Sequence, residues 1–284
     1  MNDPAIRRRF GRALTNVFMY SILIGISLFM MLPFFWMLST SLKPAEEIFH
    51  IPPIIISKNF SFASYLELFK HRNILRVLGN TILISTLATT LNLFFSSMAG
   101  FGFAKYKFPG KNSLFAFLLA TFIVPFTVTM VPLFVMMNRM HWVDTIWPLV
   151  VPGAASAFGI FFMRQYISSI NDELLDAARM DGASEFLIYW RIILPIVAPG
   201  LTSLGLIFFM ASWNSFIWPL VILKSPQNFT LPIAINSYVA GTIGRPVYNL
   251  QMAASIISIL PLLVIFLIFQ RRYFEGITAG AIKS

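Results

Sequence analysis

The sequence predicts an all-α integral membrane protein with six transmembrane helices and a long cytoplasmic loop between the fourth and fifth. Three observations predict this class. Of the 284 residues, 57% are hydrophobic and only 11% are charged, whereas a soluble domain is about 45–50% apolar and about 25% charged. Six stretches without charge each reach roughly the 20 residues that cross a bilayer as a helix. Basic residues gather between these stretches, as they do beside membrane spans.

The composition also excludes several classes of protein. Apolar surface is too plentiful for a disordered chain, and polar residues are too few to coat a soluble enzyme. The net charge of +10 fits loops that flank membrane spans better than a nucleic-acid surface. The chain has no cysteine, which excludes disulfides and thiolate metal sites. Its three histidines lie far apart in the sequence, without the spacing of metal ligands.

The charge-free stretches locate the spans. They predict helices near residues 17–39, 77–99, 113–136, 145–164, 200–223 and 251–270. Arginines before the first stretch are similar to the start of a signal peptide, but the apolar run is too long and no cleavage site follows, so we expect an uncleaved helix. The uncharged segment Ser225–Gly244 is rich in proline, glycine and polar residues, and we interpret it as a loop.

The distribution of Lys and Arg predicts the orientation. If the N-terminus is inside, the inner segments with Arg164 carry 13 of the 21 basic residues. This bias favours a cytoplasmic location for both termini. The protein is therefore expected in a cell membrane, which it crosses several times.

The motifs that are missing restrict the mechanism. No Asp, Glu, Lys or Arg lies well inside a predicted span, which argues against proton pumps and ion-coupled carriers. Backbone carbonyls can also bind Na⁺, so a stand-alone ion-coupled secondary carrier stays the alternative. Gly110-Lys111-Asn112 lacks the other residues of a phosphate-binding loop. The chain is expected to hydrolyse no ATP itself.

The loop of residues 164–199 holds five of the eleven acidic residues. Asn171 is a suitable N-cap for a helix that begins with two acids, and Gly182 can take the left-handed conformation that ends it. A second helix is expected at about 184–194, ended by Pro195 and Pro199. The pair predicts a helix–turn–helix at the inner membrane face. It could bind a partner protein or rest on lipid headgroups.

Within this loop, Asp176-Ala177-Ala178, Asp181-Gly182-Ala183 and Ile192-Ile193-Leu194-Pro195 match one known pattern in their spacing. They resemble the "EAA" loop of permease subunits of ABC importers, here at about 171–199. The family pattern has Glu where this chain has Asp176, so the charge is kept on a shorter side chain.

The resemblance extends over nearly the whole chain. The segments 35–44, 161–165 and 212–214 are similar to the carbohydrate-importer branch, and residues 276–283 to the C-terminal tail of the maltose-type second permease subunit. In that family the loop forms a coupling helix that sits in a groove on the ATPase. The resemblance gives this role to Asp176, Ala177, Ala178, Asp181, Gly182 and Ala183.

The resemblance also implies the partners: a second permease subunit, two ATPase subunits that carry ATP and Mg²⁺, and an extracytoplasmic sugar-binding protein. This chain would be a transport subunit without cofactor, metal or covalent chemistry. The tail would reach the interface between the ATPase subunits through Gly276, Thr278, Ala279 and Gly280. A frayed terminus is the other interpretation.

Two further sets of residues are candidates for contact with the substrate or with the binding protein. Planar polar groups and aromatic faces bind sugars, and this selects Asn92, Trp213, Asn214 and Ser215 for the substrate path. The same groups could instead form hydrogen bonds between helices. On the outer side, Asn236, Ser237 and Tyr238 are expected to contact the binding protein, unless the segment is a structured lid.

Overall fold

The computed structural model describes residues 4–70, 72–240 and 247–281, and this part of the chain contains helices and loops but no strand. The predicted all-α class is confirmed. The chain divides into two compact units. The first comprises Met1–His71 and Tyr238–Ile256, and the second comprises Arg72–Ser237 and Ile257–Ser284.

The first unit begins with the long helix α1 (Pro4–Ser41). Its segment Leu14–Ser41 is long and apolar enough to cross a membrane, and its large apolar side chains are exposed along most of that length. Exposed leucine, isoleucine and phenylalanine on every side of a helix are typical of contact with lipid or with neighbouring membrane helices.

A polar loop follows α1 in the first unit and leads through η1 (Ala45–Glu47) to α2 (Ala63–Lys70). The buried Lys43 fixes this loop, because its Nζ donates to the carbonyl of Ile54 and lies 4.7 Å from the ring centroid of Trp36. Burial lowers the pKa of Lys43, and the charge of Glu47 opposes this shift. The lysine therefore stabilises the chain where it leaves the predicted first span.

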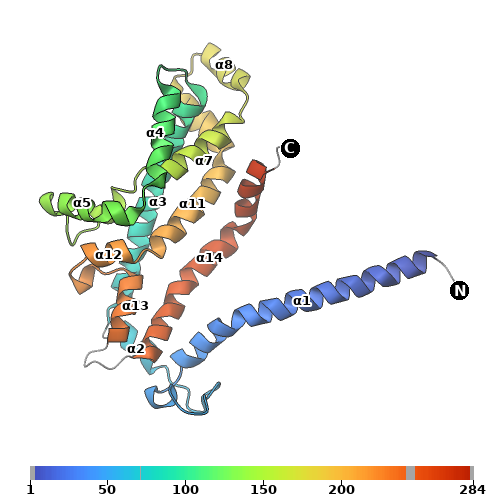
Figure 1. The fold of residues 1–284 in the computed structure, drawn as a ribbon, viewed down its shortest axis with the longest axis vertical. Helices are drawn as coiled ribbons and strands as arrows, with labels where there is room; N and C mark the ends of the chain where they lie inside the picture. The colour runs from blue at the N-terminus through green and yellow to red at the C-terminus, as the bar shows by residue number, and fades with distance from the viewer. Residues whose placement is uncertain (1–3, 71, 241–246, 282–284) are drawn as a thin grey trace. The chain divides into compact units, whose positions relative to one another are not determined.

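The second unit is built around α3 (Ile74–Lys105), which packs against α7 (Ala157–Ser168) and α11 (Ala198–Trp213) (Figure 1). The approach of α7 depends on Gly159, since a Cβ there would lie 2.4 Å from Ser96 Oγ on α3. Only a residue without a side chain fits at this distance. Gly100 of α3 is in the same position on the other side, since a Cβ there would lie 2.7 Å from Met163 Cβ on α7, so the close packing of the two helices depends on both glycines.

Two predicted spans are bent in the structure. The third consists of α4 (Lys111–Ile123) and α5 (Phe126–Arg139), which meet at 96°. Pro125 lies at the break, where it cannot donate a helical hydrogen bond. The fifth is preceded by the segment Glu185–Ile196, which meets α11 at 78°.

The fourth predicted span is divided between α6 (Trp147–Val150) and α7. Three helices in the described part of the chain are long and apolar enough to cross a membrane, or up to five with the two bent pairs. The count of six spans therefore stays a prediction.

The interpretation of Ser225–Gly244 as a loop is wrong over much of its length. After α12 (Ile217–Ile222), the segment forms η3 (Pro226–Asn228) and α13 (Leu231–Ala240). Pro232 lies in the first turn of α13, where a missing N–H costs nothing. The Leu231 N–H donates to Thr81 Oγ1 on α3 at 2.8 Å, so tertiary packing stabilises the start of this helix. The last helix is α14 (Tyr248–Ala281).

Candidate functional site

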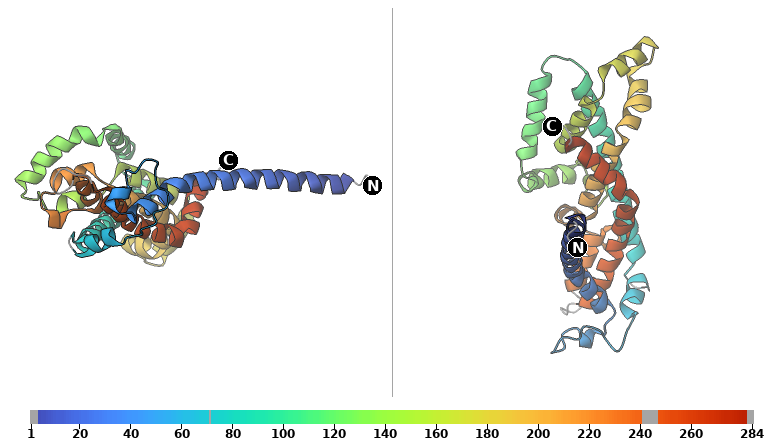
Figure 2. Two further views of the ribbon diagram at one scale, coloured as in Figure 1. Left: turned by 90° about the horizontal axis from the view of Figure 1, so that it is seen from below. Right: turned by 90° about the vertical axis from the view of Figure 1, so that its right-hand side faces the viewer.

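The predicted helix–turn–helix is present at one end of the second unit, where α8 (Asp172–Met180) projects in Figure 1 and in the right-hand view of Figure 2. We call residues 171–196 the hairpin. Asn171 caps α8 by accepting a hydrogen bond from the N–H of Glu173 at 3.1 Å. Gly182 has φ +80°, so the left-handed turn expected there is confirmed. The Ala183 N–H donates to the carbonyl of Ala178 at 3.0 Å and closes the turn.

The second helix that the sequence predicts is present as one continuous helical run, Glu185–Ile196, but it contains a π-helical turn that was not expected. It consists of α9 (Glu185–Ile188), the π-helical turn η2 (Tyr189–Ile193) and α10 (Leu194–Ile196). Pro195 does not end it, because the ring lies in the first turn of α10, where no helical donor is needed. The break comes one residue after α10, at Val197.

One side of the hairpin is anchored in a hydrophobic core. Leu175, Ile188 and Ile193 are fully or almost fully buried with Phe101 of α3 and Met163 of α7. These side chains join the hairpin to the two helices at the centre of the second unit. The hairpin therefore cannot move independently of α3 and α7 without exposing this core to water.

The predicted coupling residues divide into two groups. Asp176, Ala177, Asp181 and Gly182 are exposed at the hairpin tip, and the neighbouring Met180 is 88% exposed. Ala178 and Ala183 are partly buried and pack against the core of this chain. Their small size brings α8 close to its own unit, so these two alanines contact this chain itself.

Charged side chains tie the hairpin together. Arg179 donates to Asp176 Oδ1 at 2.8 Å and to Glu185 Oε1 at 2.8 Å, and so joins α8 to α9. Hydrogen bonds to Glu185 and then to Asp176 raise the pKa of Arg179. The guanidinium fork suits two carboxylates at fixed positions. Arg179 therefore adds two ion pairs to the turn and the buried core that hold the two short helices together.

Two residues at the C-terminal end of α3, its last residue Lys105 and the following Tyr106, hold the hairpin from the side. Lys105 Nζ donates to Asp172 Oδ1 at 2.6 Å and to the carbonyl of Ile170 at 2.5 Å. The hydrogen bond from Lys105 lowers the pKa of Asp172. Tyr106 donates its hydroxyl proton to Glu185. Burial, followed by the hydrogen bond and charge of Glu185, raises the pKa of Tyr106 to about 12, so this donor stays protonated.

Sequence reasoning missed Lys105, Tyr106 and Arg179 as members of this site. Lys105 and Asp172 are 67 residues apart, and Tyr106 and Glu185 are 79 residues apart. Local patterns carry no information about pairs at this separation. The available signal was the placement of a basic and an aromatic residue at the inner end of the second predicted span.

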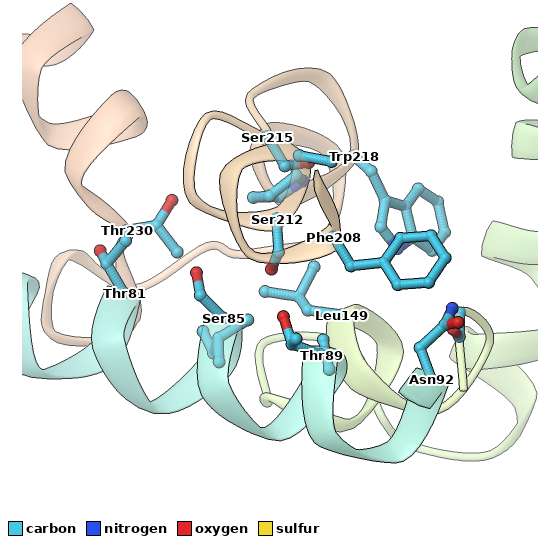
Figure 3. A pocket seen from close by; sticks show the side chains of 15 residues that line it. Thr81, Ser85, Thr89, Asn92, Leu149, Phe208, Ser212, Ser215, Trp218 and Thr230 are labelled. Carbon is cyan, nitrogen blue, oxygen red and sulfur yellow. The ribbon is translucent and has the colours of Figure 1, made fainter. Parts of the chain in front are cut away.

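A polar cavity lies inside the second unit, at the middle of α3. Its volume is about 190 Å³. Thr81, Ser85, Thr89 and Asn92 recur every three or four residues, so they lie on one face of α3 and line the cavity (Figure 3). The remaining walls come from α6 and the loop after it, from α11 and α12, and from the residue before α13. The residues that these segments contribute are Leu149, Gly153, Phe208, Ala211, Ser212, Ser215, Trp218, Pro219 and Thr230. Ile84 and Ala88 of α3 also line the cavity.

Some polar groups of the lining hold the helices together. Asn92 Nδ2 donates to the carbonyl of Gly153 at 2.6 Å, and its Oδ1 accepts from Ser96 at 2.9 Å. Thr81 Oγ1 donates to the carbonyl of Val77 and accepts from Leu231. Trp218 Nε1 donates to the carbonyl of Pro148 at 2.9 Å. Asn92 therefore acts, at least in part, as the interhelical hydrogen-bonding group that was the other interpretation of this residue.

Three hydroxyls of the cavity have no hydrogen-bond partner among the described residues. They belong to Ser85, Thr89 and Thr230, whose side chains are 1%, 9% and 4% exposed. An unpaired buried hydroxyl costs about 1–3 kcal/mol. Three such groups on one cavity are therefore an expensive arrangement that packing alone does not explain.

Two of the residues predicted for the substrate path do not line the cavity. Asn92 and Ser215 do, but Trp213 is buried beside Phe209, and Asn214 is exposed and donates to the carbonyl of Met210. The helix α11 ends at Trp213, so the chain turns away just after it. The hydroxyl row of α3 was not predicted as part of the path, although its spacing of four residues can be read directly from the sequence.

The segment after α12 is fixed by Asp144. Its Oδ1 accepts from the N–H groups of Lys224 and Ser225 at 2.8 and 3.0 Å, and its Oδ2 accepts from Ser225 Oγ at 2.5 Å. Burial acts to raise the pKa of Asp144, but the hydrogen bonds from Ser225, Lys224 and Asn228 lower it to about 2. This carboxylate therefore stays ionised at any physiological pH.

The three residues predicted to contact a binding protein lie on α13, not on a loop. Asn236 and Ser237 are exposed, whereas Tyr238 is buried at 6% exposure. The tail residues Gly276, Thr278, Ala279 and Gly280 are on the last turns of α14, where the structure describes the backbone but not the side chains.

The described residues contain no group of three or more His, Asp or Glu side chains that could hold a metal ion. The cavity lining contains no ionisable side chain. Long apolar helices, an uncharged polar cavity and an acidic hairpin anchored to the central helix together define a helical membrane protein with an internal polar site.

Comparisons with known proteins identify the family. A profile described as "Binding-protein-dependent transport system inner membrane component" matches residues 92–278. The chain is also 37% identical over 275 residues to the "Arabinooligosaccharides transport system permease protein AraQ" of Bacillus subtilis (strain 168), covering 96% of this chain and 95% of that protein. The chain therefore belongs to the family of binding-protein-dependent transport system inner membrane components.

A second relative and a solved structure agree with this result. The chain is 30% identical over 272 residues to the "Lactose transport system permease protein LacG" of Rhizobium radiobacter, covering 96% of this chain and 98% of that protein. A crystal structure of a bacterial ABC transporter involved in the import of the acidic polysaccharide alginate matches the fold with a TM-score of 0.80 at 21% identity. The match covers 93% of this chain and 97% of that chain.

Proposed function

We propose that this chain is a permease subunit of an ABC importer and forms part of the path by which a saccharide crosses the membrane. One observation carries the proposal: an exposed hairpin whose tip is open to a partner and whose base is fixed at the end of the central helix by one salt bridge, a hydrogen bond from Tyr106 and a buried core. A rigid hairpin of this kind transmits force, because its two anchors prevent it from bending away. Family membership and the two oligosaccharide and lactose permease relatives support the proposal.

The proposed mechanism begins at the hairpin tip. When ATP binds to the ATPase subunits, the groove that holds Ala177 and Gly182 moves, and the hairpin moves with it. Lys105 and Tyr106 then transfer this displacement to the inner end of α3. Because α3 is one continuous helix that also carries Thr89 and Asn92, motion at its inner end changes the walls of the polar cavity.

The proposed assembly contains a second permease subunit, two ATPase subunits and an extracytoplasmic sugar-binding protein. ATP and Mg²⁺ belong to the ATPase subunits, and this chain needs no cofactor or metal for its role. Both termini lie in the cytoplasm in this proposal, since the basic residues of the inner segments favour that orientation. The hairpin then faces the ATPases, and α13 faces the binding protein.

Two finer assignments belong to the same proposal. The C-terminal residues 276–284 enter the interface between the ATPase subunits. On the outer side, the exposed Asn236 and Ser237 contact the binding protein, while the buried Tyr238 supports α13 from within.

The alternative of a stand-alone ion-coupled carrier is not favoured by any observation. The lining of the cavity offers neither a carboxylate for a proton nor a charged group for a coupled ion.

The absence of native cysteine allows a direct test. Ala177→Cys on the exposed tip should form a crosslink with an ATPase subunit in native membranes. Ile51→Cys, which is 90% exposed on the predicted outer side, is the matched control and should form none. The reconstituted complex should import a labelled saccharide only with ATP and the binding protein. Labelling of Ala177→Cys by an impermeant outside reagent, or import by the single chain alone, would contradict the proposal.

A further inference from the structure

The polar cavity holds hydrogen-bonding groups that the fold itself does not use. Figure 3 shows the hydroxyls of Ser85, Thr89 and Ser212 pointing into one space. Those of Ser85 and Thr89 have no partner among the described residues, and their side chains are almost fully buried. A buried hydroxyl without a partner is destabilising, and water or a ligand that fills the cavity removes the penalty.

The size of the cavity limits what can fill it. At about 30 Å³ for each water, the 190 Å³ correspond to about six waters. Pockets that enclose whole drug-sized ligands measure about 300–1,000 Å³. The cavity is therefore large enough for one sugar unit.

The walls combine the two features by which proteins bind sugars. Hydroxyls from α3 and α11 can donate to and accept from the hydroxyl groups of a sugar. The rings of Phe208 and Trp218 also line the cavity, and aromatic faces pack against the C–H groups of a sugar ring. The indole of Trp218 is held by its hydrogen bond to Pro148, so this wall is rigid before any ligand arrives.

We propose that this cavity is a binding subsite for one uncharged sugar unit of the transported saccharide, with Ser85, Thr89 and Thr230 as its hydrogen-bonding groups. The inference rests on the proposed function and adds that this subunit itself contacts the substrate. It also assigns a substrate class. A uronate would bring a carboxylate into a site without a single basic side chain, and burying that charge unpaired is prohibitive.

Paired variants of α3 test the subsite. Ser85→Ala with Thr89→Val removes two hydroxyls from the cavity at nearly constant volume. Thr86→Val with Thr90→Val is the matched control, since both residues are exposed and follow directly in the sequence. The assembled transporter is reconstituted in liposomes with its binding protein at saturation. Initial uptake is measured for radiolabelled lactose, arabinotriose and digalacturonate, and thermal unfolding is measured for each complex.

The cavity variant should lower uptake of the neutral saccharide about tenfold or more, because two hydrogen bonds to the ligand are lost. Its midpoint of thermal unfolding should stay the same or rise, since two unpaired buried hydroxyls are removed. The control variant should change neither. Wild-type protein should import digalacturonate at no more than a small fraction of the neutral rate.

Three results would overturn the inference. Unchanged uptake by the cavity variant would show a cavity that holds water only, and the proposed function would still stand. A lower thermal midpoint with a proportional loss of uptake would show that the hydroxyls are structural. Rapid uptake of digalacturonate would refute the uncharged class. If wild-type protein imports none of the saccharides, the proposed function itself fails, and the subsite fails with it.

Discussion

The hairpin and the polar cavity belong to the same unit and share the helix α3, yet they differ in whether their polar side chains are paired. At the hairpin, Arg179, Lys105 and Tyr106 each bind a carboxylate of the loop. In the cavity, the hydroxyls of Ser85 and Thr89 are left without partners. The difference shows that the polar contacts of the hairpin stabilise one conformation, whereas the hydroxyls of the cavity remain available to a bound molecule.

The environment of each region makes this division physically reasonable. Ion pairs near water are inexpensive to form but individually weak, so the hairpin needs several of them and a hydrophobic core. Groups at membrane depth have no water beside them outside a cavity. A hydroxyl without a protein partner at that depth is tolerated only where a ligand or an ordered water forms the missing hydrogen bond.

The largest effect is expected at the turn of the hairpin. Gly182→Leu forces a branched side chain into φ +80°, which costs about 1–2 kcal/mol for a residue with a Cβ. The turn should reorganise, and substrate-driven ATPase activity of the assembled complex should fall more than tenfold. Nothing lies within 4 Å of a Cβ at this position, so the effect is one of conformation.

Gly182→Asn is the control for this variant, because asparagine tolerates the left-handed region. It should keep most of the ATPase activity. Equal loss in both variants would show that the backbone conformation is not what matters at the tip.

A smaller effect is expected when the hairpin is released from α3. Lys105→Met with Tyr106→Phe keeps the apolar bulk and removes the hydrogen bonds to Asp172, Ile170 and Glu185. Uptake should fall about fivefold or more, while the ATPases continue to hydrolyse ATP, since a lost coupling contact separates the two activities. The ratio of saccharide imported to ATP hydrolysed measures this directly.

Lys107→Met is the control for the anchor variant. Lys107 is exposed and lies near Asp172 without donating to it in the described structure. If its removal lowers the ratio as much as the double variant, a general loss of positive charge explains the result, and the specific anchor does not.

The segment after α12, which Asp144 fixes, offers a pH-dependent contrast to both regions. Asp144 has a folded pKa of about 2 against an ordinary value of 3.8. Its stabilising effect is therefore complete above pH 4 and is lost as the pH falls from about 4 to about 2. Asp144→Asn should lower the thermal midpoint at pH 7 by a few degrees and flatten its dependence between pH 4 and 2. A parallel pH profile in the two proteins would refute the assignment.

The smallest effect is expected from the buried hydroxyl pair between α3 and η2. Ser97 Oγ and Tyr189 OH are 2.7 Å apart, and Ser97 also donates to the carbonyl of Leu93. Tyr189→Phe should therefore cost only about 1 kcal/mol of unfolding free energy, measured by thermal or denaturant unfolding. Tyr166→Phe, whose hydroxyl has no hydrogen bond in the described structure, should cost less. The opposite order would show that the pair is not stabilising.

Local features of the hairpin were predictable because their causes lie within a few residues. The cap at Asn171 and the left-handed turn at Gly182 each depend on side-chain and backbone geometry inside one turn of chain. The inward packing of Ala178 and Ala183 was not predictable, since it depends on α3 and α7. A small residue on a short helix looks the same in the sequence whether its neighbour belongs to this chain or to another.

The cavity was predictable only in part. The row of hydroxyls on α3 follows from helical periodicity and required no structure. The opposite walls at Ser212 and Thr230 come from segments more than 100 residues away, and nothing local brings them together. The bend at Pro125 likewise lies inside a stretch whose charge-free length suggested one straight span, whereas the break at Val197 falls between the two prolines that were expected to end the preceding helix.

The π-helical turn η2 has a consequence for the evolution of this joint. An α-helix rotates by about 100° with each residue, and a π turn accommodates one residue more than an α turn does. Loss of a single residue from Tyr189–Ile193 would restore an ordinary α-helix. It would also rotate α8, the turn and α9 by about 100° around the helix axis. The exposed tip would then point elsewhere, so the direction of the tip depends on the length of this segment.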